Sequence, residues 1–354
     1  MNSLMFLLRK TRCFIAALCV LAGASPTLAA ETLRVLSWPG YVTPEAVRIF
    51  EQTHKVNVEL LTISTDDELW ARASENAGKN FDVMAVNTAE LRRYISAKIV
   101  TPVTSARIPN TQHQLRRFRH TENIPGLTEE GETYAIPYTY SAMGLIYNRK
   151  LVTQPPTSMT AFWDPQWRGK FLIYNAGTHN FSFTALTLGI KTPFKLAREQ
   201  FSRTLMRLVA LRDNEPRFYT RPEEVVEQFG ERDVALVYGN YGDQQVRQLR
   251  QAGFDVGMVI PEEGALAWLD CWAILRETPN QRLAEAWINY MLTPAVSGQL
   301  VEHQGLANTL RSSTPASMRH ADKLVWIEPV EDNATRAKYW ERILSGMQPA
   351  ATRQ

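Results

Sequence analysis

The pattern of apolar and polar residues along the chain predicts strands that alternate with helices. Short apolar runs with the length and composition of buried strands lie at residues 33–38, 56–63, 81–86, 171–174 and 234–238. Segments with apolar residues at helical spacing lie at 45–55, 66–76, 182–189, 193–211, 225–230, 281–292 and 326–345. Thr43 and Pro44 are placed as the N-cap and a first-turn residue of the first helix. This alternation predicts an α/β fold with mainly parallel sheets flanked by helices.

One long apolar run, residues 265–274, follows a turn signal and contains a carboxylate. Pro261 and Gly264 mark the turn, and the run after them predicts a strand buried on both faces. Asp270 lies in this strand two residues after Trp268, so that both side chains face the same side. A buried carboxylate is costly without a partner, and the pair therefore indicates a site for a cationic ligand. The alternative is a structural Asp270 that backbone N–H groups or an arginine satisfy.

Polar and aromatic residues also follow two of the predicted parallel strands. Trp38 and Tyr41 come at the end of the first strand, and Asn87 and Thr88 follow the third. Ligands of open α/β sheets bind beyond the carboxyl ends of the strands. These four residues are therefore candidate ligand-binding positions.

The first 30 residues have the features of a cleaved secretory signal. A basic start is followed by the apolar run 13–22 and by small residues at 27–30. Two of the three cysteines lie in this segment. The remaining one, Cys271, lies in an apolar run, and we expect it to be an inert core residue.

The composition is that of an ordinary soluble protein long enough for two domains, with 45% hydrophobic residues, 21% charged residues and a formal net charge of +3. The densest basic cluster, residues 116–119, is too small to indicate a nucleic-acid partner. The sequence contains no nucleophile elbow, no metal-spaced set of His and Cys, and no glycine loop for phosphate. We therefore predict a protein that is not an enzyme and needs neither a metal nor a cofactor.

Several motifs resemble those of one family of binding proteins. They are a Pro/Thr/Ser segment at 155–158 that leads into Trp163-Asp164-Pro165 and Gly169-Lys170, the run 136–148, the segment from Pro261 to Asp270, and Leu292-Thr293-Pro294. The resemblance covers nearly the whole mature chain. In this combination the chain resembles a periplasmic solute-binding protein of an ABC importer, and most of all the spermidine/putrescine-binding branch.

The resemblance implies a two-lobed fold of the second periplasmic-binding-protein type, with the ligand cleft between the lobes. We expect a signal peptide at 1–30, a first lobe of 31–139 and 272–310, and a second lobe of 140–271 and 311–354. Ligand contacts from both lobes would stabilise a closed state through motion at the hinge.

The resemblance also implies a site in which aromatic rings hold methylene groups and carboxylates hold amines. Trp38, Tyr41, Trp268 and Asp270 match this pattern, and Asp243 matches an acid of the putrescine-type members. The family's other acids fall near Ala176 and His179, and its tryptophan near residue 238 is replaced by Asn240. The nine candidate ligand-binding residues are Trp38, Tyr41, Asn87, Thr88, His179, Asn240, Asp243, Trp268 and Asp270.

We predict a monomeric periplasmic protein that captures a polyamine or a related small cationic amine and delivers it to an ABC permease in the inner membrane. Because Asn175, Ala176 and His179 stand where the family has carboxylates, we expect a short diamine or an ω-amino acid to bind better than spermidine or spermine. The alternative at the site is an ordinary polyamine site from which His179 points away. The alternative functions are a binding protein that serves a membrane sensor and one for an ω-amino acid or other amine.

Overall fold

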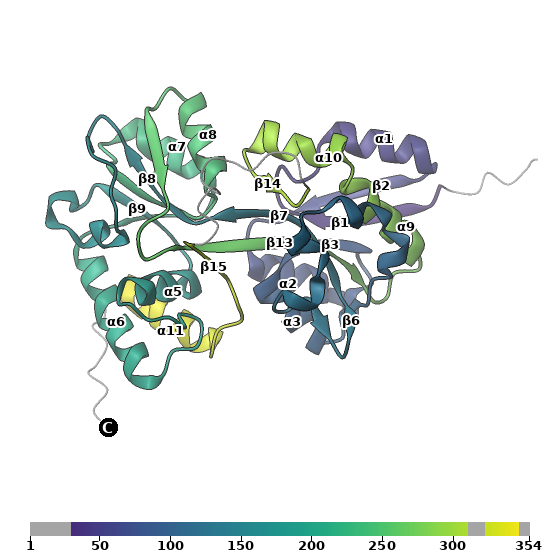
Figure 1. Cartoon of the computed structure of the whole chain (residues 1–354), viewed down its shortest axis with the longest axis horizontal. Helices are drawn as coiled ribbons and strands as arrows, with labels where there is room; N and C mark the ends of the chain where they lie inside the picture. The colour runs from purple at the N-terminus through teal and green to yellow at the C-terminus, as the bar shows by residue number, and fades with distance from the viewer. Residues whose placement is uncertain (1–29, 311–322, 347–354) are drawn as a thin grey trace, which may run out of the picture. The chain divides into compact units, whose positions relative to one another are not determined.

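Two mixed β-sheets organise the computed structural model, which describes residues 30–310 and 323–346 (Figure 1). Among these residues, eight strands form one sheet and five form the other. Helices pack against both sheets, so the prediction of an α/β fold is confirmed.

The larger sheet begins with parallel strands connected by helices. Strands β1 (Thr32–Ser37), β2 (Asn57–Thr62) and β3 (Val83–Asn87) alternate with α1 (Pro44–His54) and α2 (Asp66–Ser74), and α3 (Thr88–Ser96) follows β3. Strand β1 pairs in parallel with both β2 and β3. The Thr43 side chain accepts a hydrogen bond of 3.1 Å from the backbone N–H of Ala46 and so caps α1. The predicted order of elements is confirmed up to β3, whereas α3 was not predicted.

Strand β13 (Ala265–Leu275) is the central strand of the larger sheet, and every one of its residues is buried. It runs antiparallel to β3 and to β7 (Ala135–Ala142). Three short strands complete the sheet: β4 (Val100–Thr101), β14 (Ala307–Asn308) and β15 (Leu324–Trp326). The expectation of mainly parallel sheets is wrong, because β7 and β13 each return against their neighbours.

The smaller sheet has the order β10-β9-β11-β8-β12. Its strands are β8 (Gly144–Asn148), β9 (Phe171–Tyr174), β10 (Arg217–Tyr219), β11 (Leu236–Gly239) and β12 (Val256–Val259). The longer helices that accompany it are α5 (Gly177–Thr187), α6 (Arg198–Asp213), α7 (Pro222–Glu231) and α8 (Asp243–Gln251). Helix α6 begins five residues later than expected, and α8 was not predicted.

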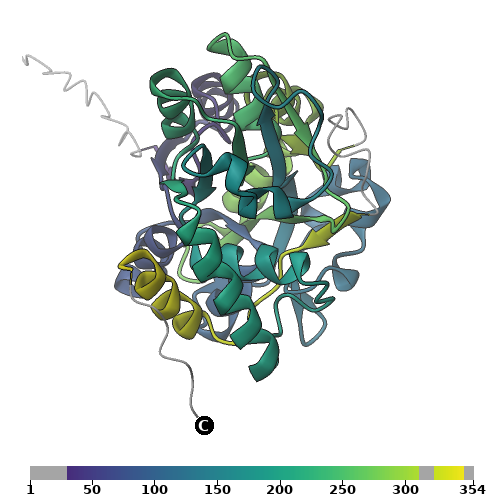
Figure 2. The ribbon, with the colours of Figure 1, turned by 90° about the vertical axis from the view of Figure 1, so that its left-hand side faces the viewer.

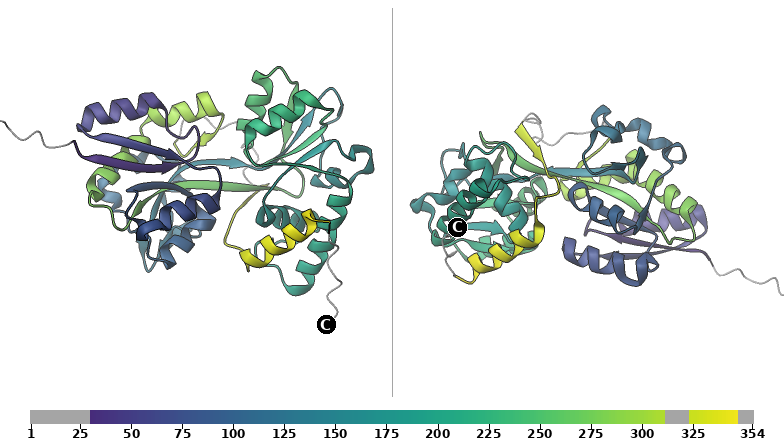
Figure 3. Two further views of the ribbon diagram at one scale, coloured as in Figure 1. Left: turned by 180° about the vertical axis from the view of Figure 1, so that it is seen from behind. Right: turned by 90° about the horizontal axis from the view of Figure 1, so that it is seen from below.

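The chain passes between the two sheets at places where one strand leads into another. Strand β7 of the larger sheet continues through Met143 into β8 of the smaller sheet, and β12 leads through residues 260–264 into β13 (Figure 3). Gly264 has φ = +89°, and an added Cβ would lie 2.6 Å from the carbonyl oxygen of Lys323. The predicted lobe boundaries at 139/140, 271/272 and 310/311 are not tested by these connections and remain a proposal.

The closing helix α11 (Asn333–Leu344) packs beside α5 and α6 (Figure 2). It begins later than the predicted residue 326, because β15 and an extended segment come first. Arg336 is fully buried and donates two 2.8 Å hydrogen bonds to the Glu331 carboxylate. It also donates to Ser182 and to the carbonyl oxygen of Pro193, and these bonds fix α11 to the helices of the smaller sheet.

The remaining elements connect these parts. They are α4 (Arg116–Arg119), β5 (Thr128–Glu129), β6 (Glu132–Thr133), α9 (Gln281–Met291), α10 (Pro294–Gln299) and a π-helical turn at Leu300–Gln304. No helix within 30–310 and 323–346 combines the length and apolar character needed to cross a membrane. The predicted signal segment, 1–30, lies outside the described residues except for Ala30.

Candidate functional site

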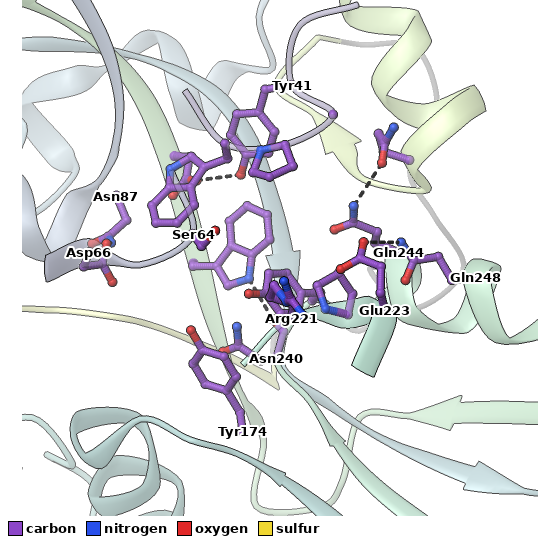
Figure 4. Close-up of a pocket in the computed structure, with 18 of the residues that line it drawn as sticks. Tyr41, Ser64, Asp66, Asn87, Tyr174, Arg221, Glu223, Asn240, Gln244 and Gln248 are labelled. Carbon is purple, nitrogen blue, oxygen red and sulfur yellow. Dashed lines mark hydrogen bonds between the residues drawn. The ribbon is translucent and has the colours of Figure 1, made fainter. Parts of the chain in front are cut away.

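A cavity of about 340 Å³ is lined by residues from both sheets and the loops at their ends (Figure 4). Seven of the nine predicted ligand-binding residues line it: Trp38, Tyr41, Asn87, His179, Asn240, Trp268 and Asp270. Aromatic side chains, carboxylates and carboxamides make up most of the remaining wall. A cavity of this kind is the usual form of a small-molecule site.

The loop after β1 presents two of the rings. Tyr41 N–H donates to the carbonyl oxygen of Trp38 at 3.3 Å, which closes a four-residue turn. Pro39 and Gly40 are its central residues, and Gly40 has φ = +81°. This is the arrangement that a type II turn requires, since its third residue needs a positive φ. Pro39 and Gly40 therefore place Trp38 and Tyr41 at the cavity.

Asp270 reaches the cavity from the middle of β13. Asp270 is only 6% exposed, and the hydroxyl of Tyr41 donates a hydrogen bond to its Oδ2 at 2.5 Å. The pairing of β13 with β7 is irregular between Asp270 and Cys271, next to Pro137, which has no N–H for the ladder. Trp268 lines the same cavity, as the alternation along a strand predicted.

No cationic side chain neutralises Asp270 in the described parts of the chain, where none of the ion pairs includes it. Burial raises its pKa to about 7, although the hydrogen bond from Tyr41 has the opposite effect. The structural alternative required an arginine or backbone N–H groups, and the described hydrogen bonds of this carboxylate come from Tyr41 alone. A carboxylate held in this way is suited to a cationic ligand that enters the cavity.

Trp268 connects the two sheets across the cavity. Its indole N–H donates to the carbonyl oxygen of Asn240 at 2.9 Å, and Asn240 directly follows β11 of the smaller sheet. The indole is 8% exposed. The Gln244 side chain of α8 makes a comparable contact, a 3.0 Å hydrogen bond to Gln304. Both bonds exist only while the two sheets keep this arrangement.

His179 is neutral at physiological pH. Burial lowers its pKa to about 4, and the neighbouring Asn240 carboxamide opposes this effect only in part. Its ring stacks on Tyr174 with centroids 5.8 Å apart. His179 lines the cavity, as predicted, but a neutral imidazole does not repel an ammonium group by charge.

A second carboxylate, Asp66, also lines the cavity. It is the first residue of α2, and Asn87 Nδ2 donates to its Oδ1 at 2.8 Å. Burial raises the pKa of Asp66 well above its usual range, and the negative charges of Glu90 and Asp270 add to the effect. Sequence reasoning missed Asp66 as a site residue, because an acid in the first turn of a helix is fully explained by the helix dipole.

Other lining residues were missed because only the tertiary fold brings them here. They are Ser64, Tyr174, Arg221, Pro222, Glu223, Tyr241, Gln244, Gln248, Gln304 and Ile327, together with Pro39 and Gly40. A usable signal existed for Tyr174 and Tyr241, which follow or end strands in the same way as Trp38 and Asn87. Arg221 is exposed and forms an ion pair of 3.1 Å with Glu224. Its guanidinium group therefore does not neutralise the neighbouring Glu223.

Two predicted residues do not line this cavity. Thr88 is the first residue of α3 and lines a second cavity, together with Arg116, Arg117 and Trp326. Asp243 is the first residue of α8, and its backbone oxygen lies near Gly305. The neighbouring Gln244 lines the cavity in its place.

Several polar atoms in the cavity wall are suited to a ligand. Trp38 Nε1, His179 Nδ1 and Asn240 Oδ1 are buried and have no hydrogen-bond partner of acceptable geometry among the described residues. Buried polar atoms are rarely left in this state. The wall offers no metal site, since the described part of the chain contains no group of three or more His, Cys, Asp or Glu side chains that could hold an ion.

Known proteins share both the sequence pattern and the fold. The family model for bacterial extracellular solute-binding proteins matches residues 45–325. The putrescine-binding periplasmic protein PotF of Escherichia coli is 22% identical over 355 residues, which cover 90% of this chain and 94% of PotF. The spermidine/putrescine-binding periplasmic protein of the same organism is 21% identical over 282 residues, which cover 78% of this chain and 76% of that protein.

Solved structures agree on the fold. The spermidine/putrescine ABC transporter substrate-binding protein PotD from Streptococcus pneumoniae superposes with a TM-score of 0.72 at 18% identity, over 89% of this chain and 98% of PotD. The two-lobed α/β fold of periplasmic binding proteins is therefore confirmed. Since the family model covers most of the chain, this protein belongs to the family of bacterial extracellular solute-binding proteins.

Proposed function

We propose that this protein captures a polyamine or a related small cationic amine in the periplasm and delivers it to an ABC permease in the inner membrane. The observation that carries the proposal is the buried Asp270 carboxylate, which opens into an aromatic cavity and has no cationic partner in the described residues. An anion held out of water in this way is stabilised by a ligand that brings the missing positive charge.

The rest of the wall supports an alkyl amine as the ligand. Trp38, Tyr174, Tyr241 and Trp268 supply rings that can cover methylene groups, and a cation over such a ring gains about 0.5–2 kcal/mol. The names of the relatives point in the same direction, since PotF binds putrescine and a second relative binds spermidine and putrescine. Delivery to a permease is proposed because PotD of Streptococcus pneumoniae is the substrate-binding protein of a spermidine/putrescine ABC transporter. We further propose that the protein acts as a monomer.

Binding can be tested by calorimetry. The purified protein, freed of bound amine by unfolding and refolding, is titrated with putrescine, cadaverine, agmatine, spermidine and γ-aminobutyrate. We expect heat from at least one of the cationic amines, with a stoichiometry of one. If none of them binds, the proposal is wrong, because Asp270 then serves another purpose. Uptake of the labelled amine by cells with and without the gene would test delivery.

A further inference from the structure

Asp66 gives the cavity a second anionic end. Its side chain lines the same cavity as Asp270, although the two residues are 204 positions apart in the sequence and come from different elements. Figure 4 shows Asp66 beside Asn87 at one side of the cavity, away from Tyr41. Within the described residues no ion pair includes Asp66, and its only side-chain partner is the Asn87 carboxamide.

The orientation of Asn87 fixes the position of Asp66. Asn87 is the N-cap of α3, and its Oδ1 accepts the backbone N–H of Glu90 at 3.0 Å. Because the oxygen is used in this way, the Nδ2 of the same carboxamide must point toward Asp66, to which it donates at 2.8 Å. Asn87 is thus a positioning residue that holds the second carboxylate at the cavity wall.

The sheet register makes Asn87 a direct neighbour of Asp270. Asn87 of β3 lies directly opposite Asp270 of β13, so their Cβ atoms are about 5 Å apart and on the same face of the sheet. Asp66 is one hydrogen bond beyond Asn87. Asn87 therefore neighbours both carboxylates. Consistent with this, the charge of Asp270 raises the pKa of Asp66.

An unused acceptor lies in the wall of the same cavity. Asn240 is 6% exposed, and its Oδ1 has no hydrogen-bond partner of acceptable geometry in the described residues. It neighbours His179, which stacks on Tyr174, and the pKa of Tyr174 is raised in part by the charge of Asp66. Asn240 therefore lies beside His179 and near Tyr174 in the cavity wall. An ammonium group is a donor of the kind that this oxygen lacks.

We propose that Asp66 and Asp270 act as the two ends of a clamp that selects a dication with amines at both ends, one ammonium group against each carboxylate. This inference rests on the proposed function and narrows it from small cationic amines to diamines. Trp38 and Trp268 then contact the methylene chain between the two ends. Asp66 is a binding residue in this arrangement, and Asn87 holds it in place.

Charge pairing gives the reason for the selection. Two carboxylates that share a small cavity repel each other, and each resists ionisation as long as it lacks a cation. A diamine neutralises both, and a monoamine neutralises only one. An ω-amino acid with its amine at Asp270 would bring its own carboxylate toward Asp66 and repel it. The expected order of affinity is diamine, then monoamine, then ω-amino acid.

Calorimetry with matched ligands and variants tests the clamp. The wild-type protein and the variants Asp66→Asn and Asp67→Asn are titrated with putrescine, butylamine and γ-aminobutyrate. We expect Asp66→Asn to lower the affinity for putrescine at least about thirtyfold and to leave the affinity for butylamine within about threefold. Asp67→Asn is the control, since it removes the same charge from the neighbouring residue, which is exposed and does not line the cavity.

The outcomes separate this inference from the function on which it rests. If the wild-type protein binds no amine, both are overturned. If it binds putrescine and Asp66→Asn binds putrescine equally well, the clamp is overturned and amine binding stands. Should Asp66→Asn fail to fold, the wild-type protein alone decides: tighter binding of butylamine or γ-aminobutyrate than of putrescine overturns the clamp, and the reverse order supports it.

Discussion

The hydroxyl of Tyr41 donates to Oδ2 of Asp270 at 2.5 Å and is the closest polar neighbour that the structure gives this buried carboxylate. The bond joins the turn after β1 to the middle of β13, two segments that are far apart in the sequence. It orients the carboxylate without neutralising it, since a neutral phenol carries no positive charge. Asp270 is thus held in place and still in need of a cation.

Binding of an amine should depend on pH with a midpoint near 7. The pKa of Asp270 is raised to about 7 by burial, so the free protein holds a proton there at lower pH. An ammonium ligand needs the ionised carboxylate, and its affinity should therefore fall by up to about tenfold for each pH unit below the midpoint. Calorimetry in buffers of different ionisation enthalpy would also detect a proton released on binding near neutral pH.

His179 provides the control for this pH dependence. Its pKa of about 4 means that it stays neutral over the range in which Asp270 titrates. His179→Gln should therefore leave the midpoint of the pH profile where it is. A midpoint that disappears in His179→Gln and persists in Asp270→Asn would assign the titration to the imidazole and contradict the account.

Tyr41→Phe should move the midpoint toward higher pH. The hydrogen bond from Tyr41 stabilises the ionised form of Asp270, so its loss raises the pKa of that carboxylate further. The lost bond to a charged group should weaken amine binding at neutral pH by about 1.5–3 kcal/mol. The pH profile of binding for Tyr41→Phe checks the prediction. An unchanged midpoint would mean that the hydroxyl does not act on Asp270.

Trp268→Phe should shift the protein toward a more open arrangement. The substitution keeps a ring in the cavity and removes the 2.9 Å bond from the indole N–H to the Asn240 carbonyl oxygen. This bond joins a strand of the larger sheet to the loop after β11, and its loss should cost about 0.5–1.5 kcal/mol. Small-angle scattering should show a larger radius of gyration for the free variant, and compaction only when ligand is added. Equal radii for both proteins at every ligand concentration would contradict the prediction.

The sequence was sufficient for much of the fold because local signals agree with the tertiary structure there. The cap at Thr43, the alternation of strands and helices up to β3, and the buried strand after Gly264 all follow from patterns within a few residues. The mixed character of the sheets does not follow from such local patterns. Which way β7 and β13 run relative to β3 depends on pairings between residues more than 100 positions apart.

The candidate site was predictable where strand periodicity alone places side chains. Trp268 and Asp270 lie on one face of β13, and Asn87 lies at the end of β3. Asp66 was not predictable in this way, since its place at the cavity depends on the hydrogen bond from Asn87. His179 lines the cavity, but its charge state follows from burial, which the sequence does not reveal.

The central claim is that Asp270 is an anchor for a cationic ligand and not a structural carboxylate. Asp270→Asn keeps the shape and removes the charge. The free variant should be at least as stable as the wild type at pH 8, since the buried carboxylate with its raised pKa destabilises the folded state once it loses its proton. At the same pH the affinity for an amine should fall by about 2–5 kcal/mol, the range for a buried charge pair that loses one partner.

Calorimetric titration of wild type and Asp270→Asn with putrescine at pH 8, with a thermal melt of each protein as the check on folding, is the most direct measurement. The account predicts a folded variant with a strongly weakened or undetectable binding isotherm beside a wild type that binds. A variant that unfolds, or one that is folded and binds putrescine as tightly as the wild type, would contradict it.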